Sequence, residues 1–321
     1  MTRRTAVPIT LLTGFLGAGK TTWLSRALKD EAAGRVAVLV NEFGAVGIDH
    51  LLVGTIAPDT VLLDSGCICC QIRGELKDAI LNLMTQARNG EVPQFDRIVI
   101  ETTGLADPSQ ILSTLTFDPV LHNQVVLQDV VTVADAQNGV SLHADQPEWV
   151  AQVAAASTIL LSKTDLVPQD RLPNLQLRLG LINPTAQLLD AQKCPTFADI
   201  ACDSGNRPVL TNIRAPTHSD GTGAQTLSLS FDDPLDWTGF VVWLSALIHR
   251  HGTNLLRVKC LLKTREGIVL IDGVGHTLHH PRHLDSTMPS DQRSHLVFIG
   301  RNLDMALLRA SFEAFLNVKT S

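Results

Sequence analysis

Residues 14–21 run Gly14-Phe15-Leu16-Gly17-Ala18-Gly19-Lys20-Thr21 and match the pattern G-x-x-x-x-G-K-[ST] at every fixed position. The apolar residues 9–12 come directly before this loop and predict a buried strand, and residues 22–28 predict a helix behind it. A phosphate-binding loop needs this setting, because it joins the end of a strand to the start of a helix. The sequence therefore predicts a site for a nucleoside triphosphate.

The residue types in this loop suit an anionic ligand. Glycines let the backbone curl so that successive N–H groups converge on the β-phosphate, and the following helix directs its positive N-terminus at the same anion. Lys20 is expected to reach the β- and γ-phosphate oxygens, and the hydroxyl of Thr21 to bind Mg²⁺. The alternative is a glycine-rich turn without a ligand. The predicted phosphate-binding residues are Gly14, Gly17, Ala18, Gly19, Lys20, Thr21 and Thr22.

Length and composition bound the organisation of the chain and the class of its partners. With 321 residues the chain is long for one core, which predicts two domains, and 45% hydrophobic residues are enough to fill both. The formal net charge of −6 provides no basic surface for DNA or RNA. We therefore expect no nucleic-acid partner.

The N-terminus, with Arg3-Arg4 followed by apolar residues, resembles a twin-arginine export signal. The apolar run leads directly into the phosphate loop, so cleavage there would destroy the site, and a strand is the preferred interpretation. No other stretch approaches the ~18–20 apolar residues that span a bilayer. We therefore expect a soluble, cytoplasmic protein with no membrane partner.

Apolar segments alternate with amphipathic ones up to about residue 190, which is typical of a mostly parallel sheet with helices on both faces. The expected strands are 36–40, 61–63, 97–100, 125–133, 158–161 and 186–189. The expected helices are 21–32, 75–88, 148–155 and 171–181. Together with the phosphate loop, this order predicts an α/β fold of the P-loop NTPase type.

The pattern changes in the last third of the chain. Residues 195–225 are rich in Pro, Gly, Ser, Asp and Asn and predict a linker. Beyond the linker, strands are expected at 227–231, 255–262, 267–271 and 295–299, and helices at 237–250 and 303–316. This order predicts a smaller α+β domain with a largely antiparallel sheet. The expected domains are therefore 1–194 and 226–321.

Glu101-Thr102-Thr103-Gly104 follows the expected strand at 97–100. A carboxylate at a strand end suits a group that holds Mg²⁺ or orients water, and the glycine lets the backbone move as the γ-phosphate comes and goes. Alone this motif is unspecific, but downstream of a phosphate loop in a parallel sheet it is more specific. The predicted catalytic residues are Lys20, Thr21 and Glu101.

The strand expected at 158–161 leads into Ser162-Lys163-Thr164-Asp165, a variant of the guanine-reading tetrad Asn-Lys-x-Asp. The carboxylate of Asp165 can accept both the N1–H and the N2–H of guanine, a donor pair that adenine lacks, and Lys163 can lie along the base. GTP is therefore expected rather than ATP. Ser162 is shorter than Asn and should make fewer bracing hydrogen bonds. The alternative is a strand-to-helix turn capped by Asp165.

Three of the six cysteines lie together in Cys67-Ile68-Cys69-Cys70. In a reducing cytosol this cluster predicts a metal or redox site rather than a disulfide framework. Thiolates favour Zn²⁺, Cu(I) or similar ions, and three of them could hold a tetrahedral ion with one position left for a mobile ligand. The alternative is a buried or redox-active trio. Candidate fourth ligands are Glu42, Glu75 and His122, although Glu75 also suits a helix N-terminus and the other two suit solvated loops.

The other histidines and cysteines are less informative. A second cluster lies beside Pro281 and Arg282 in the C-terminal domain, where histidines are more often surface residues than metal ligands. Its members are His276, His279, His280 and His283. The remaining cysteines, Cys194, Cys202 and Cys260, are scattered and are expected to be structural.

The motifs taken together resemble the CobW family of P-loop GTPases. In the first domain the resemblance is carried by residues 14–22, Asn41-Glu42-Phe43-Gly44, Gly66-Cys67-Ile68-Cys69-Cys70, Glu101-Thr102-Thr103-Gly104-Leu105-Ala106-Asp107-Pro108 and Ser162-Lys163-Thr164-Asp165. In the second domain, Leu255-Leu256-Arg257-Val258-Lys259 and Leu296-Val297-Phe298-Ile299-Gly300-Arg301 are similar to that family's C-terminal domain. The resemblance spans nearly the whole chain.

The resemblance implies a metallochaperone. Cys67, Cys69 and Cys70 would bind a transition metal, most often zinc or cobalt, and GTP would control its release to a client metalloprotein. A homo-oligomer is possible, and the sequence does not determine the oligomeric state. The chain departs from the family at the linker, which has only His218 where many members are histidine-rich, and at Cys260, which stands in place of a usual Gly. Two other classes stay open, namely an ATP-dependent small-molecule kinase and a metal sensor or buffer with structural nucleotide.

Overall fold

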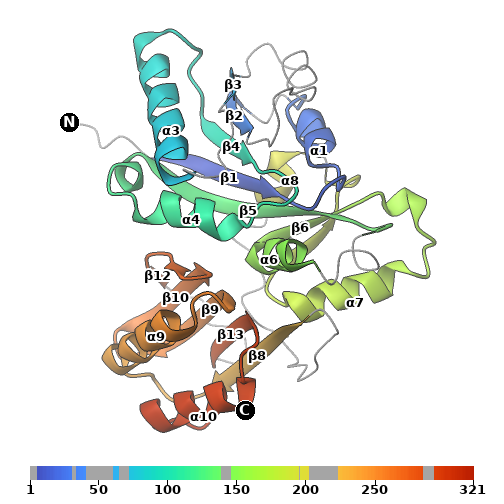
Figure 1. Cartoon of the computed structure of the whole chain (residues 1–321). Coiled ribbons are helices and arrows are strands. Elements are labelled where there is room, and N and C mark those ends of the chain that lie inside the picture. The colour runs from blue at the N-terminus through green and yellow to red at the C-terminus, as the bar shows by residue number, and fades with distance from the viewer. Residues whose placement is uncertain are drawn as a thin grey trace.

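A parallel sheet forms the centre of the first domain (Figure 1). The computed structural model describes residues 6–30, 34–40, 61–64, 72–138, 146–194, 196–201, 223–284 and 293–321. Seven strands in the described part form the sheet in the order β3-β2-β4-β1-β5-β6-β7, and all of their pairings are parallel. They are β1 (Val7–Thr13), β2 (Val36–Val40), β3 (Val61–Asp64), β4 (Arg97–Glu101), β5 (Val125–Asp135), β6 (Thr158–Ser162) and β7 (Gln187–Asp190).

Helices cover both faces of this sheet, which confirms the predicted layers. On one face lie α3 (Ile72–Asn89), α4 (Pro108–Phe117), α6 (Pro147–Ala155) and α7 (Leu172–Ile182), whose apolar side chains pack on Ile9, Leu11, Ile159 and Leu161. On the other face, α1 (Lys20–Ala27) and α8 (Phe197–Ala201) pack on alternate residues of the same strands, such as Leu12 and Leu160. Strands buried on both faces explain the near-continuous apolar runs in the sequence.

Apart from shifts of one to three residues at other helix ends, the helices differ from the sequence prediction in three places. α1 ends at Ala27 rather than 32, because Lys29 N–H bonds Arg26 O and tightens the last turn. α4 was not predicted, although Asp107 accepts the N–H of Ser109 at its start and Pro108 occupies the first turn. α8 lies within the stretch predicted as linker, where Phe197 and Ile200 are buried. In the described part, no helix is long and apolar enough to cross a membrane.

The C-terminal domain has an antiparallel sheet, as the sequence predicted. Its strands are β8 (Ala224–Phe231), β9 (Leu255–Thr264), β10 (Gly267–Val274), β11 (Thr277–Leu278), β12 (Arg282–Leu284) and β13 (Ser294–Arg301). They run in the order β11-β10-β9-β13-β8, with β12 paired to β10. One face of this sheet is covered by α9 (Trp237–His251) and α10 (Met305–Leu316), whose Trp243 and Phe312 rings meet edge to face at 5.1 Å. The two short strands β11 and β12 were not predicted.

The other face of the C-terminal sheet packs on the first domain (Figure 1). Ala154 of α6 shares a buried cluster with Leu261 of β9 and with Val297 and Ile299 of β13. Val274, at the end of β10, belongs to the core cluster that also contains residues of α3 and α4. The two domains therefore share buried apolar surface, and their contact runs along α4 and α6.

Candidate functional site

The phosphate loop lies at the carboxyl ends of the central strands, between β1 and α1. Its glycines are required by the backbone, since Gly14, Gly17 and Gly19 have φ values of 142°, 70° and 93°. A side chain at Gly14 would also place its Cβ 2.3 Å from Val133 O. The predicted glycine positions are thus explained by local geometry.

Lys20 lies across this loop. It is buried, and its Nζ donates hydrogen bonds to Gly14 O at 2.9 Å and Phe15 O at 3.3 Å. The ammonium group is therefore held by the loop's own carbonyl groups. A bound phosphate would replace these carbonyl oxygens with stronger, charge-assisted partners.

Thr21 and Glu101 meet in the structure. Thr21 Oγ1 donates a 2.6 Å hydrogen bond to Glu101 Oε1, and Glu101 is buried at the end of β4. Glu101 reaches this place because it pairs with Leu12 of β1 and Val40 of β2 in the sheet. A hydroxyl beside a carboxylate is the hard oxygen donor set that Mg²⁺ prefers, so these two residues fit that ion.

The segment after Glu101 crosses directly over the phosphate loop. A Cβ atom at Gly104 would lie 2.5 Å from Leu16 N, so only glycine allows this approach. Thr102 Oγ1 also donates to Thr13 Oγ1 at 2.8 Å, which ties the segment to the end of β1. The predicted mobile glycine therefore lies against the phosphate loop.

The residues of the predicted guanine tetrad lie beside the phosphate loop. Ser162 Oγ donates a 2.6 Å hydrogen bond to Ala18 O, so this serine braces the phosphate loop despite its short side chain. Lys163 has a left-handed backbone (φ 57°), and its Nζ lies 2.7 Å from Asp135 Oδ2. Asp165 is exposed and accepts a hydrogen bond from Gln192 Nε2. The carboxylate predicted to bind guanine is thus within reach of a ligand.

Asp135, at the end of β5, anchors Lys163. Burial alone would raise the pKa of Asp135, but three donors oppose it, namely Lys163 Nζ and the backbone N–H groups of Gln137 and Asn138. Together they hold the pKa of Asp135 below its ordinary value. Asp135 therefore stays ionised and holds the lysine in place.

The sequence did not predict that residues 191–194, which follow β7, belong to the site. The backbone of this segment is tied to α1, because Trp23 Nε1 donates to Cys194 O at 3.0 Å and the Arg26 guanidinium donates to Ala191 O. Its Gln192 side chain reaches Asp165, as described above. The one available signal was the carboxylate of Asp190 at a strand end, which accepts hydrogen bonds from Thr164 Oγ1.

The predicted metal ligands are mostly not described. Glu42, Cys67, Cys69 and Cys70 lie outside the described residues, as does the side chain of Glu75, whose backbone is in α3. His122 is exposed in the short 3₁₀ helix η2 (Leu121–Asn123). Among the described residues, no three His, Cys, Asp or Glu side chains are grouped so that they could hold a metal ion.

The C-terminal histidines are mainly on the surface, as expected. His276, His280 and His283 are exposed, and the His280 ring lies 4.7 Å from that of His122 in the first domain. His279 differs, since it is half-buried and burial lowers its pKa. Of the cysteines expected to be structural, Cys260 is fully buried in the core of the sheet, and burial raises the pKa of its thiol well above the ordinary value.

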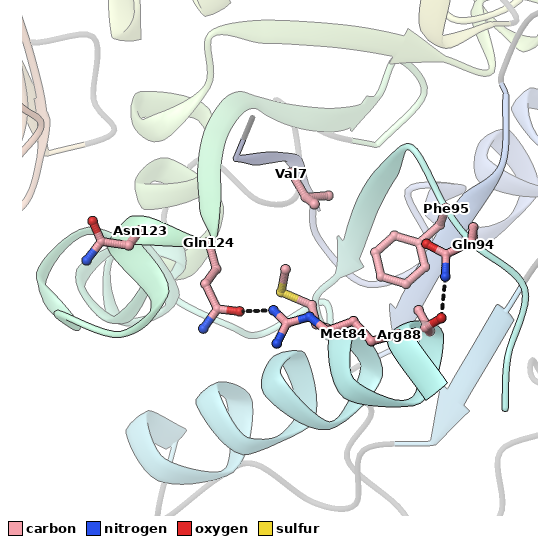
Figure 2. A pocket seen from close by; sticks show the side chains of 8 residues that line it. Val7, Met84, Arg88, Gln94, Phe95, Asn123 and Gln124 are labelled. Atoms are coloured by element: carbon pink, nitrogen blue, oxygen red, sulfur yellow. Dashed lines mark hydrogen bonds between the residues drawn. The ribbon is translucent and has the colours of Figure 1, made fainter. Parts of the chain in front are cut away.

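A separate hollow of about 180 Å³ lies at the amino end of β1, beside α3 (Figure 2). Val7, Met84 and Phe95 give it an apolar wall, and Arg88 Nη2 donates to Gln124 Oε1 at 2.8 Å across one side. None of the predicted nucleotide-binding residues lines it. Ligands of open α/β sheets bind at the carboxyl ends of the strands, so this hollow is not part of the nucleotide site.

Comparison with known proteins agrees with this geometry. Residues 8–190 match the family model of the CobW/HypB/UreG nucleotide-binding domain, and residues 224–316 match the cobalamin synthesis protein CobW C-terminal domain. The zinc chaperone YjiA of Escherichia coli is 42% identical over 331 residues, which cover 95% of this chain and 98% of that protein. The zinc chaperone CobW of Pseudomonas aeruginosa is 28% identical over 345 residues, which cover 94% of this chain and 89% of that protein.

Solved structures give the same result. The crystal structure of the Zn(II)-bound YjiA GTPase from E. coli superposes with a TM-score of 0.72 at 27% identity, covering 97% of this chain and 99% of that one. The fold and the resemblance predicted from the sequence are therefore confirmed. The chain belongs to the CobW/HypB/UreG family.

Proposed function

We propose that this chain is a GTP-hydrolysing zinc chaperone that carries Zn²⁺ at Cys67, Cys69 and Cys70 and delivers it to a client metalloprotein. The observation that carries the nucleotide part is the hydrogen bond between Thr21 and Glu101 beside the phosphate loop. The names of the relatives support the zinc part, since both YjiA and CobW are called zinc chaperones.

The chain's own residues account for binding and orienting GTP. Lys20 exchanges its two loop carbonyl partners for β- and γ-phosphate oxygens. Asp165 exchanges Gln192 for the N1–H and N2–H of guanine, which selects GTP over ATP. Ser162 and Asp135 hold the phosphate loop and Lys163 in place while the base binds.

Thr21 and Glu101 would hold Mg²⁺ at this site. The ion, when bound, neutralises charge on the β- and γ-phosphate oxygens. Glu101, buried and fixed by the sheet, keeps the Thr21 hydroxyl oriented toward the phosphates. Gly104 lets the segment after Glu101 lie on the phosphate loop, so that this segment is placed to respond when the γ-phosphate is lost.

The zinc site is proposed from the sequence. Three thiolates on one short loop are soft donors suited to Zn²⁺, and Glu42, Glu75 and His122 stay the candidate fourth ligands. The three cysteines, Glu42 and Glu75 fall between the phosphate loop and Glu101 in the chain, the interval that precedes the segment proposed to sense the γ-phosphate. For GTP to control zinc, the affinity for zinc must differ between the GTP and GDP states.

Zinc titration of the purified chain tests this function. Competition with a fluorescent zinc chelator would be measured with a non-hydrolysable GTP analogue and with GDP, alongside phosphate release from GTP. We expect one tight zinc per chain, lost in the triple variant Cys67→Ser/Cys69→Ser/Cys70→Ser and kept in the control Cys194→Ser. Equal zinc affinity in the two nucleotide states would refute the control of zinc by GTP. ATP competing as well as GTP would instead favour a kinase.

A further inference from the structure

Gln152 is a buried amide among apolar residues of α6. It lies in α6, is 0% exposed, and has Trp149, Val150 and Val153 as buried neighbours on the same helix. Its Nε2 donates to Gly104 O at 3.0 Å and to Ala106 O at 3.1 Å. Burying an amide is costly unless it is hydrogen-bonded, so these two bonds explain why a glutamine is tolerated here. They also attach the segment after Glu101 to α6.

The same helix is attached to the C-terminal domain two to three residues further on. Arg257 of β9 is 2% exposed, and its guanidinium donates to the carbonyl groups of Ala154 and Ala155, the last residues of α6. The final carbonyl groups of a helix have no partner within the helix and carry partial negative charge, so a buried guanidinium stabilises this end. Asp272 of β10 holds Arg257 from the other side at 3.0 Å.

The segment 104–106 also leads into a second helix that rests on the C-terminal domain. α4 begins at Pro108, and a Cβ at Gly275, in the turn after β10, would lie 3.3 Å from Ser109 Cβ. Val274, beside that turn, is buried with Ile111 and Leu112 of α4. Both attachments of the segment, α6 through Gln152 and α4 through the chain itself, therefore contact the same C-terminal sheet.

Two buried polar atoms at or beside the segment 104–106 lack a hydrogen-bond partner among the described residues. Within the described part of the chain, Gln152 Oε1 and Thr103 Oγ1 are both buried without a hydrogen-bond partner. Buried polar atoms of native proteins are nearly always paired, so these two atoms are available to water or to a backbone group that a shift of the segment would bring close. A shift of the segment against the phosphate loop would change the contacts around Gln152 and Gly104.

We propose that Gln152 is a positioning residue for GTP hydrolysis, and that Arg257 makes the position of residues 104–106 depend on the C-terminal domain. The inference rests on the GTP hydrolysis proposed above. Energetic coupling is reciprocal, so a change in how the C-terminal domain packs on α6 changes the rate of hydrolysis, and GTP changes the stability of that packing. The rigid element that connects the two is α6.

The first test replaces the amide donor. Gln152→Glu keeps the side chain's size but presents carboxylate oxygens to two carbonyl groups, and Gln152→Ala removes the contact altogether. We expect kcat to fall about tenfold or more, with KM for GTP and the affinity for GDP within about twofold of wild type, because no residue that touches the nucleotide changes. A folded Gln152→Glu protein with wild-type kcat would overturn the proposal.

The second test separates coupling from packing. Arg257→Lys keeps the buried charge while losing the planar fork, and Arg301→Lys is the matched control, because Arg301 of β13 donates to Pro147 O at the opposite, exposed end of α6. We expect Arg257→Lys to lower kcat and to speed amide hydrogen exchange at residues 104–106, with Arg301→Lys changing neither. If Arg257→Lys leaves that exchange unchanged, or Arg301→Lys raises it equally, the coupling is refuted.

The double variant Gln152→Glu/Arg257→Lys tests whether the two residues act on hydrolysis through the same helix. Because both residues act through α6, the combined loss in kcat should be smaller than the product of the two single losses. A loss equal to that product would show two independent effects and overturn the coupling. Wild-type protein is assayed first, since absence of GTP hydrolysis there would refute the proposed function, whereas hydrolysis that is insensitive to Gln152 refutes this inference alone.

Discussion

Thr21 Oγ1 and Glu101 Oε1 lie 2.6 Å apart although 80 positions separate the two residues in sequence. The parallel pairing of β1 with β4 brings them together, because Glu101 stands opposite Leu12, at the end of the strand that enters the phosphate loop. A local motif and a distant carboxylate thus form one site.

Glu101→Gln should slow GTP hydrolysis by about a hundredfold at saturating GTP, because the amide keeps the shape but loses the charge that would hold Mg²⁺ beside Thr21. The assay is phosphate release across a range of Mg²⁺ concentrations, in which the variant should also need more Mg²⁺. Glu91→Gln, an exposed carboxylate after α3, is the control. A variant with an unchanged Mg²⁺ requirement would exclude Glu101 from the ion's site.

Gly104→Ala should push the segment 104–106 away from the phosphate loop, because its Cβ would lie 2.5 Å from Leu16 N. We expect kcat to fall and the free energy of unfolding to drop by about 1–3 kcal/mol, the usual cost of overpacking. A time course of phosphate release measures kcat, and thermal unfolding measures the loss of stability. Wild-type kcat in this variant would show that the close approach is not needed for hydrolysis.

Gly180→Ala should stabilise the protein rather than destabilise it, and it is the control for Gly104→Ala. Gly180 lies in α7, its φ is not positive, and nothing is within 4 Å of the added Cβ. Alanine in a helix interior costs less backbone entropy than glycine, so the free energy of unfolding should rise by about 0.5–1 kcal/mol. Hydrolysis should not change. Destabilisation by this substitution would contradict the described packing of α7.

The Asp135–Lys163 pair should make stability depend on pH in the acid range. Asp135 has a pKa below its ordinary value of 3.8 in the folded chain, so its contribution is complete above that value and is lost as the pH falls through the lower, folded pKa. Asp135→Asn should therefore cost about 1 kcal/mol at neutral pH, and this difference should shrink at about pH 3 and below. Urea unfolding across this range measures it, with the exposed Asp170→Asn as control. A difference that grows on acidification would reverse the assigned direction.

Asp165 and Gln192 should affect nucleotide choice in opposite directions. Asp165→Asn replaces one of the two acceptor oxygens with an NH2 donor that faces a guanine N–H, so affinity for GDP should fall about a hundredfold and preference over ADP should disappear. Gln192→Ala removes a side chain that competes with guanine for Asp165, so affinity for GDP should rise about two- to fivefold. Titration with labelled GDP and ADP measures both. Weaker GDP binding in Gln192→Ala would show that Gln192 supports the base instead.

Much of the fold follows from local patterns. The parallel sheet, the antiparallel C-terminal sheet and most helices appear where apolar periodicity predicted them, because burial on one face or both imposes that periodicity on neighbouring residues. α4 had a local signal too, since Asp107 before Pro108 is an N-cap followed by proline. The short strands β11 and β12 had none, because two or three residues are too few to show a period.

The candidate site likewise has a part that the sequence predicted and a part that only the tertiary structure revealed. The binding of phosphate proposed for residues 14–21 uses consecutive backbone groups, so adjacent residues carry the whole signal and the sequence sufficed to identify the loop. The Thr21–Glu101 contact, the bracing of Ala18 by Ser162 and the bonds from Gln152 to Gly104 and Ala106 join residues far apart in the chain. Such contacts depend on strand order, register and the packing of α6 between two sheets. No local pattern encodes these, because each arises only when separate elements bury their apolar faces against one another.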